Sequence, residues 1–162
     1  MASTPANGDS PLSFRRAWNA FNRQTGRAME TADRRMEKAD AAVVRAETAA
    51  QALRSQAVEL REAARVRFAQ ARVAAAGDIG KLAHAGGWRA SQLRRAVEME
   101  SKAHRLVDLA VGAQRTAHRE AGRACDEAIT AAEQRYEAAT GESVYRYREG
   151  GVPGIPRGGG RS

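Results

Sequence analysis

Three side chains that could bind a metal ion recur on one stripe of the sequence, at His104, His118 and Cys125. Imidazole nitrogens and thiolate sulfurs are common zinc ligands. If this region is helical, the three residues share a face but lie ~21 and ~10 Å apart along the axis. One ion cannot bridge these gaps with bonds of ~2 Å. We therefore expect no metal site and interpret Cys125, next to Asp126 and Glu127, as a small packing residue.

The glycine-rich stretch GDIGKL, residues 77–82, has neither the spacing nor the Ser/Thr of a phosphate-binding P-loop. The chain also carries no dinucleotide-binding or hydrolytic motif. An elongated helical protein offers little of the concave surface that holds substrates and cofactors. The sequence thus predicts a protein that is not an enzyme and has no cofactor.

Basic side chains form the sharpest charge pattern, separated by seven, four, seven, four and seven residues. At about 100° per residue they fall within one sector of a helix, opposite its apolar seam. We call this set the basic ridge: Arg16, Arg23, Arg27, Arg34, Lys38 and Arg45. Such a ridge is either a solvated helix face or a phosphate-contacting surface. No base-reading motif accompanies it, so any binding of nucleic acid should be non-specific.

The elements that carry these residues are predicted to be long helices. Apolar residues recur at spacings of three and four through most of the chain, and alanine stands at every seventh position from Ala96 to Ala138. Few aromatic and β-branched residues argue against a sheet. The 162-residue chain has one cysteine and a formal net charge of +8, with 24 Arg and 3 Lys. Its length indicates a single domain.

The predicted fold is all-α: a long, Ala-rich antiparallel helical hairpin, resembling a coiled coil. We expect a disordered N-terminal arm over 1–10 and a hairpin over 11–141. The hairpin comprises a helix over 12–76, a Gly-rich turn over 77–87 and a helix over 88–140, and a flexible tail follows over 142–162. The alternative is an unbroken rod in an intermolecular coiled coil, which the four glycines of the turn disfavour.

Two groups of apolar residues outside the alanine seam indicate how the hairpin packs and associates. At the open end of the hairpin, Phe14, Trp18 and Phe21 should meet Tyr136, Val144, Tyr145 and Tyr147. Alternatively, the first three could belong to a helix that lies on a membrane surface. A second stripe lies beside the seam, and we expect it to form one flank through which the chain oligomerises into a bundle. This flank consists of Val44, Val58, Val66, Val73, Met99, Leu106 and Leu109.

The sequence therefore predicts a non-enzymatic scaffold or assembly protein that acts through helix–helix contacts, with itself or with a helical partner. A non-specific nucleic-acid-associated protein is the alternative. No apolar run approaches the ~20 residues of a transmembrane helix. No export signal is recognisable, so we expect a cytoplasmic location.

Overall fold

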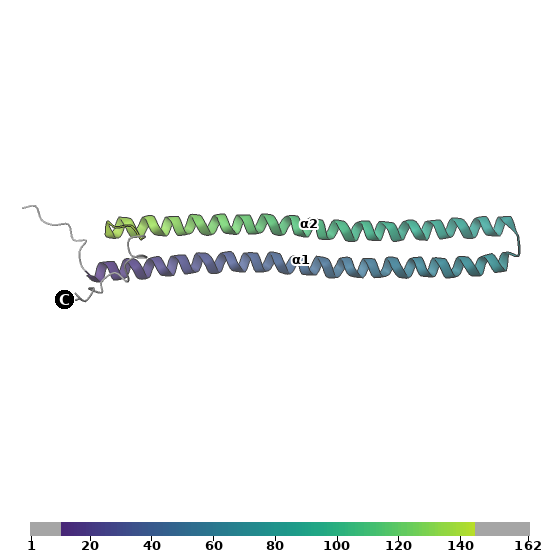
Figure 1. Ribbon diagram of the computed structural model, residues 1–162, viewed down its shortest axis with the longest axis horizontal. Helices are drawn as coiled ribbons and strands as arrows, with labels where there is room; N and C mark the ends of the chain where they lie inside the picture. Colours follow the sequence, from purple (N-terminus) through teal and green to yellow (C-terminus); the bar gives the residue numbers. More distant parts are fainter. Residues whose placement is uncertain (1–10, 145–162) are drawn as a thin grey trace, which may run out of the picture. The chain divides into compact units, whose positions relative to one another are not determined.

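The computed structural model describes residues 11–144, and these form two long helices packed against each other as an antiparallel hairpin (Figure 1). Helix α1 spans Pro11–Ala75 and helix α2 spans Ile79–Thr140. Proline suits the first position of a helix because that position needs no backbone N–H donor. Gly141, with φ of 72°, ends α2 as expected for a glycine at a helix C-terminus. The predicted hairpin is confirmed, and the predicted arm over 1–10 lies outside the described residues.

The turn is much tighter than the sequence suggested. Ala76 and Gly77 adopt left-handed conformations, with φ of 46° and 90°, and reverse the chain directly after α1. The carboxylate of Asp78 then accepts a hydrogen bond of 3.1 Å from the backbone N–H of Lys81, which makes Asp78 the N-cap of α2. The predicted turn over 77–87 is wrong because this cap starts the helix at Ile79, before most of the glycines.

Two compact units make up the hairpin. We call residues 37–116 the turn unit, and residues 11–36 with 117–144 the open-end unit. Both helices contribute to each unit. No helix among residues 11–144 is long and apolar enough to cross a membrane.

The buried seam of the turn unit follows a seven-residue period. On α1 its buried residues are Val43, Ala50, Ala57 and Ala64, followed after eleven residues by Ala75 next to the turn, and on α2 they are Ala96 and Ala103. Two helices joined along a seven-residue seam wind around each other with a left-handed twist. Because the buried side chains are mostly alanines, the helix axes can approach closely.

In the open-end unit, away from the aromatic cluster of Tyr136 and Val144, the buried residues on each helix are eleven positions apart instead. Phe21 and Ala32 are buried on α1, and Ala121 and Ala132 are buried on α2. Alanines spaced by seven cannot stay in such a seam, because each heptad drifts ~20° around a straight helix.

The alanine stripe of α2 therefore changes its role along the helix. Ala96 and Ala103 are fully buried in the turn unit, whereas Ala124 and Ala138 are exposed in the open-end unit. A stripe that faced α1 along its whole length would be buried throughout, so the stripe turns away from α1 in this second part. There the stripe forms a lateral surface of the helix pair.

An aromatic cluster forms the largest core of the open-end unit. Phe21, Tyr136 and Val144 are buried together with Ala132, and Trp18 packs against them. Ring centroids lie 6.1 Å apart for Phe21 and Tyr136, and 6.0 Å apart for Trp18 and Tyr136. The predicted contact with Tyr136 and Val144 is confirmed for Trp18 and Phe21, whereas Tyr145 and Tyr147 lie outside the described residues. Residues 142–144, assigned to the tail by the sequence, instead fold back onto this core.

Candidate functional site

The basic ridge is fully solvent-facing. All six of its side chains are exposed on α1: Arg16, Arg23, Arg27, Arg34, Lys38 and Arg45. The first four belong to the open-end unit and the last two to the turn unit. Arg34 lies 3.7 Å from the carboxylate of Glu30, one turn earlier, so part of its charge is compensated. An ion pair this exposed contributes little to stability.

A groove runs beside the ridge in the open-end unit. It has a volume of about 400 Å³, and alanines supply half of its lining residues: Ala28, Ala32, Ala121, Ala124, Ala128 and Ala131. Cys125 also lines the groove and is half-buried. Arg27, Arg35 and Arg135 stand at its edges, and the last donates a 3.0 Å hydrogen bond to the amide oxygen of Gln24. We call this feature the alanine groove.

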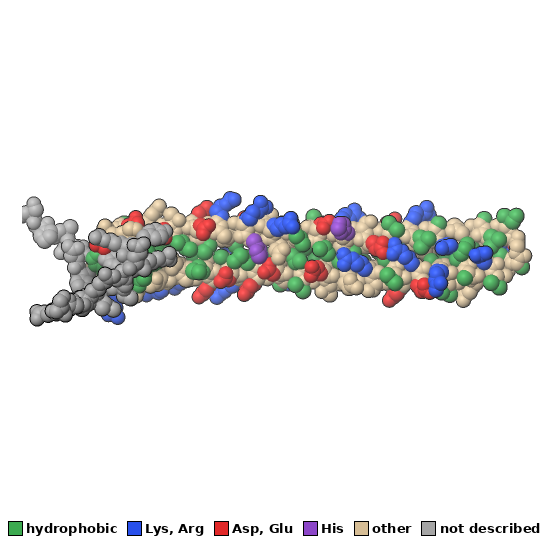
Figure 2. Space-filling model, viewed as in Figure 1, with side chains coloured by type: hydrophobic (Ala, Val, Ile, Leu, Met, Phe, Trp, Pro, Cys, Tyr) green, Lys and Arg blue, Asp and Glu red, His purple; other side chains and the backbone are tan. Residues whose placement is uncertain are grey.

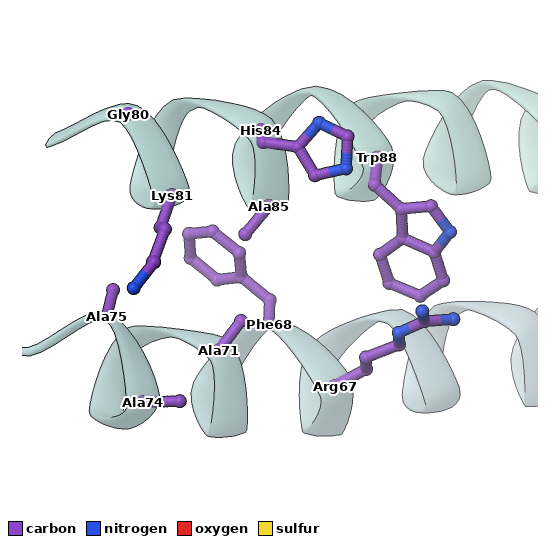
Figure 3. A pocket seen from close by; sticks show the side chains of 10 residues that line it. All are labelled: Arg67, Phe68, Ala71, Ala74, Ala75, Gly80, Lys81, His84, Ala85 and Trp88. Carbon is purple, nitrogen blue, oxygen red and sulfur yellow. The ribbon is translucent and has the colours of Figure 1, made fainter. Parts of the chain in front are cut away.

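A second groove lies next to the turn, with a volume of about 570 Å³ (Figure 3). Phe68 of α1 points between the helices towards Ala85, and the guanidinium of Arg67 lies against the ring of Trp88, 4.4 Å from its centroid. Lys81 and His84 of α2 also line the groove. This groove could not be foreseen from the sequence, because residues 77–87 were expected to form a turn and only a helix brings these side chains together.

The predicted apolar flank is exposed but is not one surface. Side chains on the outside are Val44, Val58, Val66, Val73 and Leu109, which are 44–83% exposed, whereas Met99 and Leu106 are half-buried. Figure 2 shows hydrophobic side chains reaching the surface along the helices.

Two cross-helix contacts show how the flank divides. Arg61 of α1 pairs with Glu100 of α2, and Val58 is three residues from Arg61 and so shares its side. Met99 lies three helical turns after Trp88, so the two residues are on the same face of α2. This is the face where the guanidinium of Arg67 lies over the Trp88 ring. Since Arg61 and Arg67 are about 120° apart around α1, the two contacts lie on opposite sides of the seam. The predicted single flank is therefore split between two sides of the turn unit.

Two exposed valines, Val58 and Val97, lie beside the Arg61–Glu100 contact. Val97 is three residues from Glu100, as Val58 is from Arg61, so both valines lie on the side of the hairpin where this contact forms. Val58 is 61% exposed and Val97 is 52% exposed. Further towards the turn, the guanidinium of Arg89 lies over the ring of Phe68, 4.9 Å from its centroid.

The histidines and the cysteine are not brought together. His104 is exposed and contacts Asp108 at 3.2 Å, while His118 and Cys125 are half-buried in the open-end unit. Within residues 11–144 no three His, Cys, Asp or Glu side chains are grouped closely enough to hold a metal ion. Comparison with family models, curated proteins and solved structures finds no match to this chain.

Proposed function

We propose that this chain is a non-enzymatic assembly protein that works by packing its helices against other helices, its own copies included. One observation carries the proposal, namely the imbalance between buried and exposed apolar side chains. Among the described residues, the largest fully buried side chains are Tyr136 and Val144, while nine large hydrophobic side chains are 44–83% exposed. Burying one such side chain contributes ~1.5–3 kcal/mol, so a helical partner would stabilise the hairpin substantially.

The exposed residues also favour a partner that is itself helical. They follow helical spacings on rigid elements and are interspersed with charged side chains, as on the partner-facing sides of helical bundles. They lie on more than one side of the turn unit, which supports a bundle of more than two helices.

Native mass measured at tens of micromolar tests this proposal. The chain has a mass of 17.4 kDa, and we expect at least twice that value after nuclease treatment. Val58→Glu together with Val97→Glu should lower the mass while helix content by circular dichroism stays the same. Ala41→Glu together with Ala52→Glu adds the same charge at exposed alanines of the same unit and serves as the control. A wild-type chain that is monomeric under these conditions would contradict self-association.

Binding of nucleic acid is a second proposed function, favoured by the exposure of all six ridge side chains. Each neutralised phosphate contributes about −0.9 to the slope of log affinity against log salt. Arg16→Gln with Arg23→Gln should flatten that slope by about two for mixed-sequence duplex, whereas the exposed pair Arg65→Gln and Arg72→Gln should leave it unchanged. Absence of binding even at low salt would exclude this function.

A further inference from the structure

The two helices of the open-end unit carry opposite charge. In α1, residues 11–36 include six arginines against Glu30 and Asp33. In α2, residues 117–140 include three arginines against five acidic side chains. The unit is thus formally +4 along one helix and −2 along the other, counting arginines against acids. A surface divided in this way is complementary to a second copy of itself, provided that the two helices exchange places.

The charge division continues at the edges of the alanine groove. Thr31 lines the groove on α1. Arg27 is four residues before Thr31 and Arg34 is three residues after it, so both arginines are on the same side of the helix as Thr31. Ala124 lines the groove on α2, and Glu120 and Glu127 flank it with the same spacing. All four charged side chains are exposed: Arg27, Arg34, Glu120 and Glu127. The groove is therefore basic along α1, whereas on α2 the acidic Glu120 and Glu127 flank it and Arg135 lines it.

Two hairpins can meet through this groove in two symmetric ways. A two-fold axis perpendicular to the helices would place α1 over the other copy's α1, so basic edges would face each other. A two-fold axis parallel to the helices places α1 over the other copy's α2, with the basic edge on the acidic edge. Like charges placed together cost free energy, whereas complementary edges fix the orientation of the partners. The difference in charge between the two helices therefore favours the two-fold axis that is parallel to them.

The heights of the charged residues fit this arrangement. A two-fold axis parallel to the helices keeps each residue and its equivalent in the other copy at the same position along the axis. Differences in position along the axis within one copy therefore also apply between the two copies. The contact between Gln24 and Arg135 fixes the relation between the helices, and counting from it places Glu127 between Arg27 and Arg34. Glu120 lies about five residues, ~7.5 Å, beyond Arg34 along the helix axis. Both carboxylates are within the reach of arginine side chains on the facing copy.

We propose that the open-end unit docks on the same unit of a second copy, in parallel, through the alanine groove, with Arg27 and Arg34 of each copy facing Glu120 and Glu127 of the other. This proposal rests on the proposed assembly function, and it specifies which surface the two copies use and how they are oriented. The alanines allow the helices of the two copies to approach closely, near the short end of the ~8–10 Å range. The charged edges determine which helix meets which.

A charge-reversal series tests the pairing. Arg27→Glu with Arg34→Glu should lower dimer affinity at least tenfold by sedimentation, and Glu120→Arg with Glu127→Arg should do the same. Combining all four substitutions restores complementary edges and should recover dimerisation. Arg15→Glu with Arg54→Glu changes the net charge equally at exposed sites away from the groove and is the matched control. Circular dichroism verifies that each variant remains helical.

The single cysteine provides an independent readout of orientation. Because Cys125 lines the groove and equivalent residues share a height, a short bismaleimide should link Cys125 of two wild-type copies. Dimers without this crosslink, or a four-fold variant that stays monomeric, would overturn the parallel arrangement. If both reversals leave a wild-type-like oligomer, this surface is wrong but assembly through another surface stands. A monomeric wild type overturns both the surface and self-association.

Discussion

Arg61 on α1 and Glu100 on α2 are joined across the turn unit by two hydrogen bonds, of which the Nη2–Oε2 bond is 2.7 Å long. This two-pronged geometry is the strongest that an arginine and a carboxylate can form. The hydrogen bonds from Arg61 lower the pKa of Glu100, and they outweigh the partial burial that raises it. Both side chains are only half-buried, so the contact specifies the alignment of the helices more than it stabilises them.

The lowered pKa of Glu100 predicts a pH dependence of stability. The folded chain holds the proton less tightly than the unfolded chain, so the pair stabilises above the unfolded pKa of about 4.3. This contribution is lost as the pH falls through the lower, folded pKa. The melting temperature of Glu100→Gln should lie below that of the wild type at pH 7 and converge with it under acid conditions. Glu98→Gln, at an exposed position nearby, should show no such convergence if thermal melts are followed at several pH values.

Ala76 is predicted to limit the stability of the turn. Its positive φ brings the β-carbon close to the following carbonyl oxygen, which glycine avoids. Ala76→Gly should therefore raise the free energy of unfolding by about 0.5–1 kcal/mol, after allowing for the greater freedom of glycine in the unfolded chain. The same change at Ala74, inside α1, should lower it by about 1 kcal/mol. Chemical denaturation measures both, and equal effects at the two positions would contradict the strained turn.

Asp78 is predicted to set the start of α2. Removing its carboxylate with Asp78→Ala leaves the N–H of Lys81 without this acceptor and should cost about 1 kcal/mol. Asp78→Asn keeps an oxygen in the same place and should cost much less. Urea denaturation of the two variants provides the measurement. A loss as large for asparagine as for alanine would mean that the negative charge, and not the cap, is responsible.

Tyr136 buries a hydroxyl group for which the described part of the chain offers no hydrogen-bond partner. Tyr136→Phe should thus be neutral or stabilise by up to about 1 kcal/mol, because a buried, unpaired hydroxyl carries a desolvation cost. Tyr136→Ala should cost about 3–5 kcal/mol by opening a cavity among the aromatic rings. Destabilisation by the phenylalanine variant would show that the hydroxyl is satisfied in solution.

The same residue predicts a sensitivity to alkaline pH. Burial raises the pKa of Tyr136, and the nearby negative charge of Glu142 raises it further. The folded chain holds this proton more tightly than the unfolded chain, so stability is complete below the ordinary pKa of about 10 and declines as the pH rises through the folded value. The Tyr136→Phe variant should lack this part of the alkaline decline in melting temperature.

Regular spacing made much of the fold predictable. The three-and-four pattern of apolar residues identified both helices, and Gly141 correctly marked the end of α2. The cluster of Phe21 with Tyr136 and Val144 followed from folding the chain back on itself, because large aromatic side chains at one end of a hairpin have few other places to be buried.

The turn and the sites were less predictable, for identifiable physical reasons. Glycine counts suggested a loop over 77–87, but one aspartate cap outweighed the weak helix propensity of the glycines. The exposed position of Ala124 depends on the change from a seven-residue to an eleven-residue seam. That change is set by which side chains pack against the partner helix, and the spacing of α2 alone does not reveal it.

The glycines inside the first turns of α2 have a consequence for how the hairpin opens. Gly86 and Gly87 have nothing within 4 Å of the position where a β-carbon would be, and each lowers local helix stability by about 1 kcal/mol relative to alanine. Amide protons in this stretch should exchange with solvent through small, frequent openings, while those near Ala96 and Ala103 should exchange only when the packed helices separate. The helix next to the turn can thus unfold locally while the rest of the hairpin stays folded.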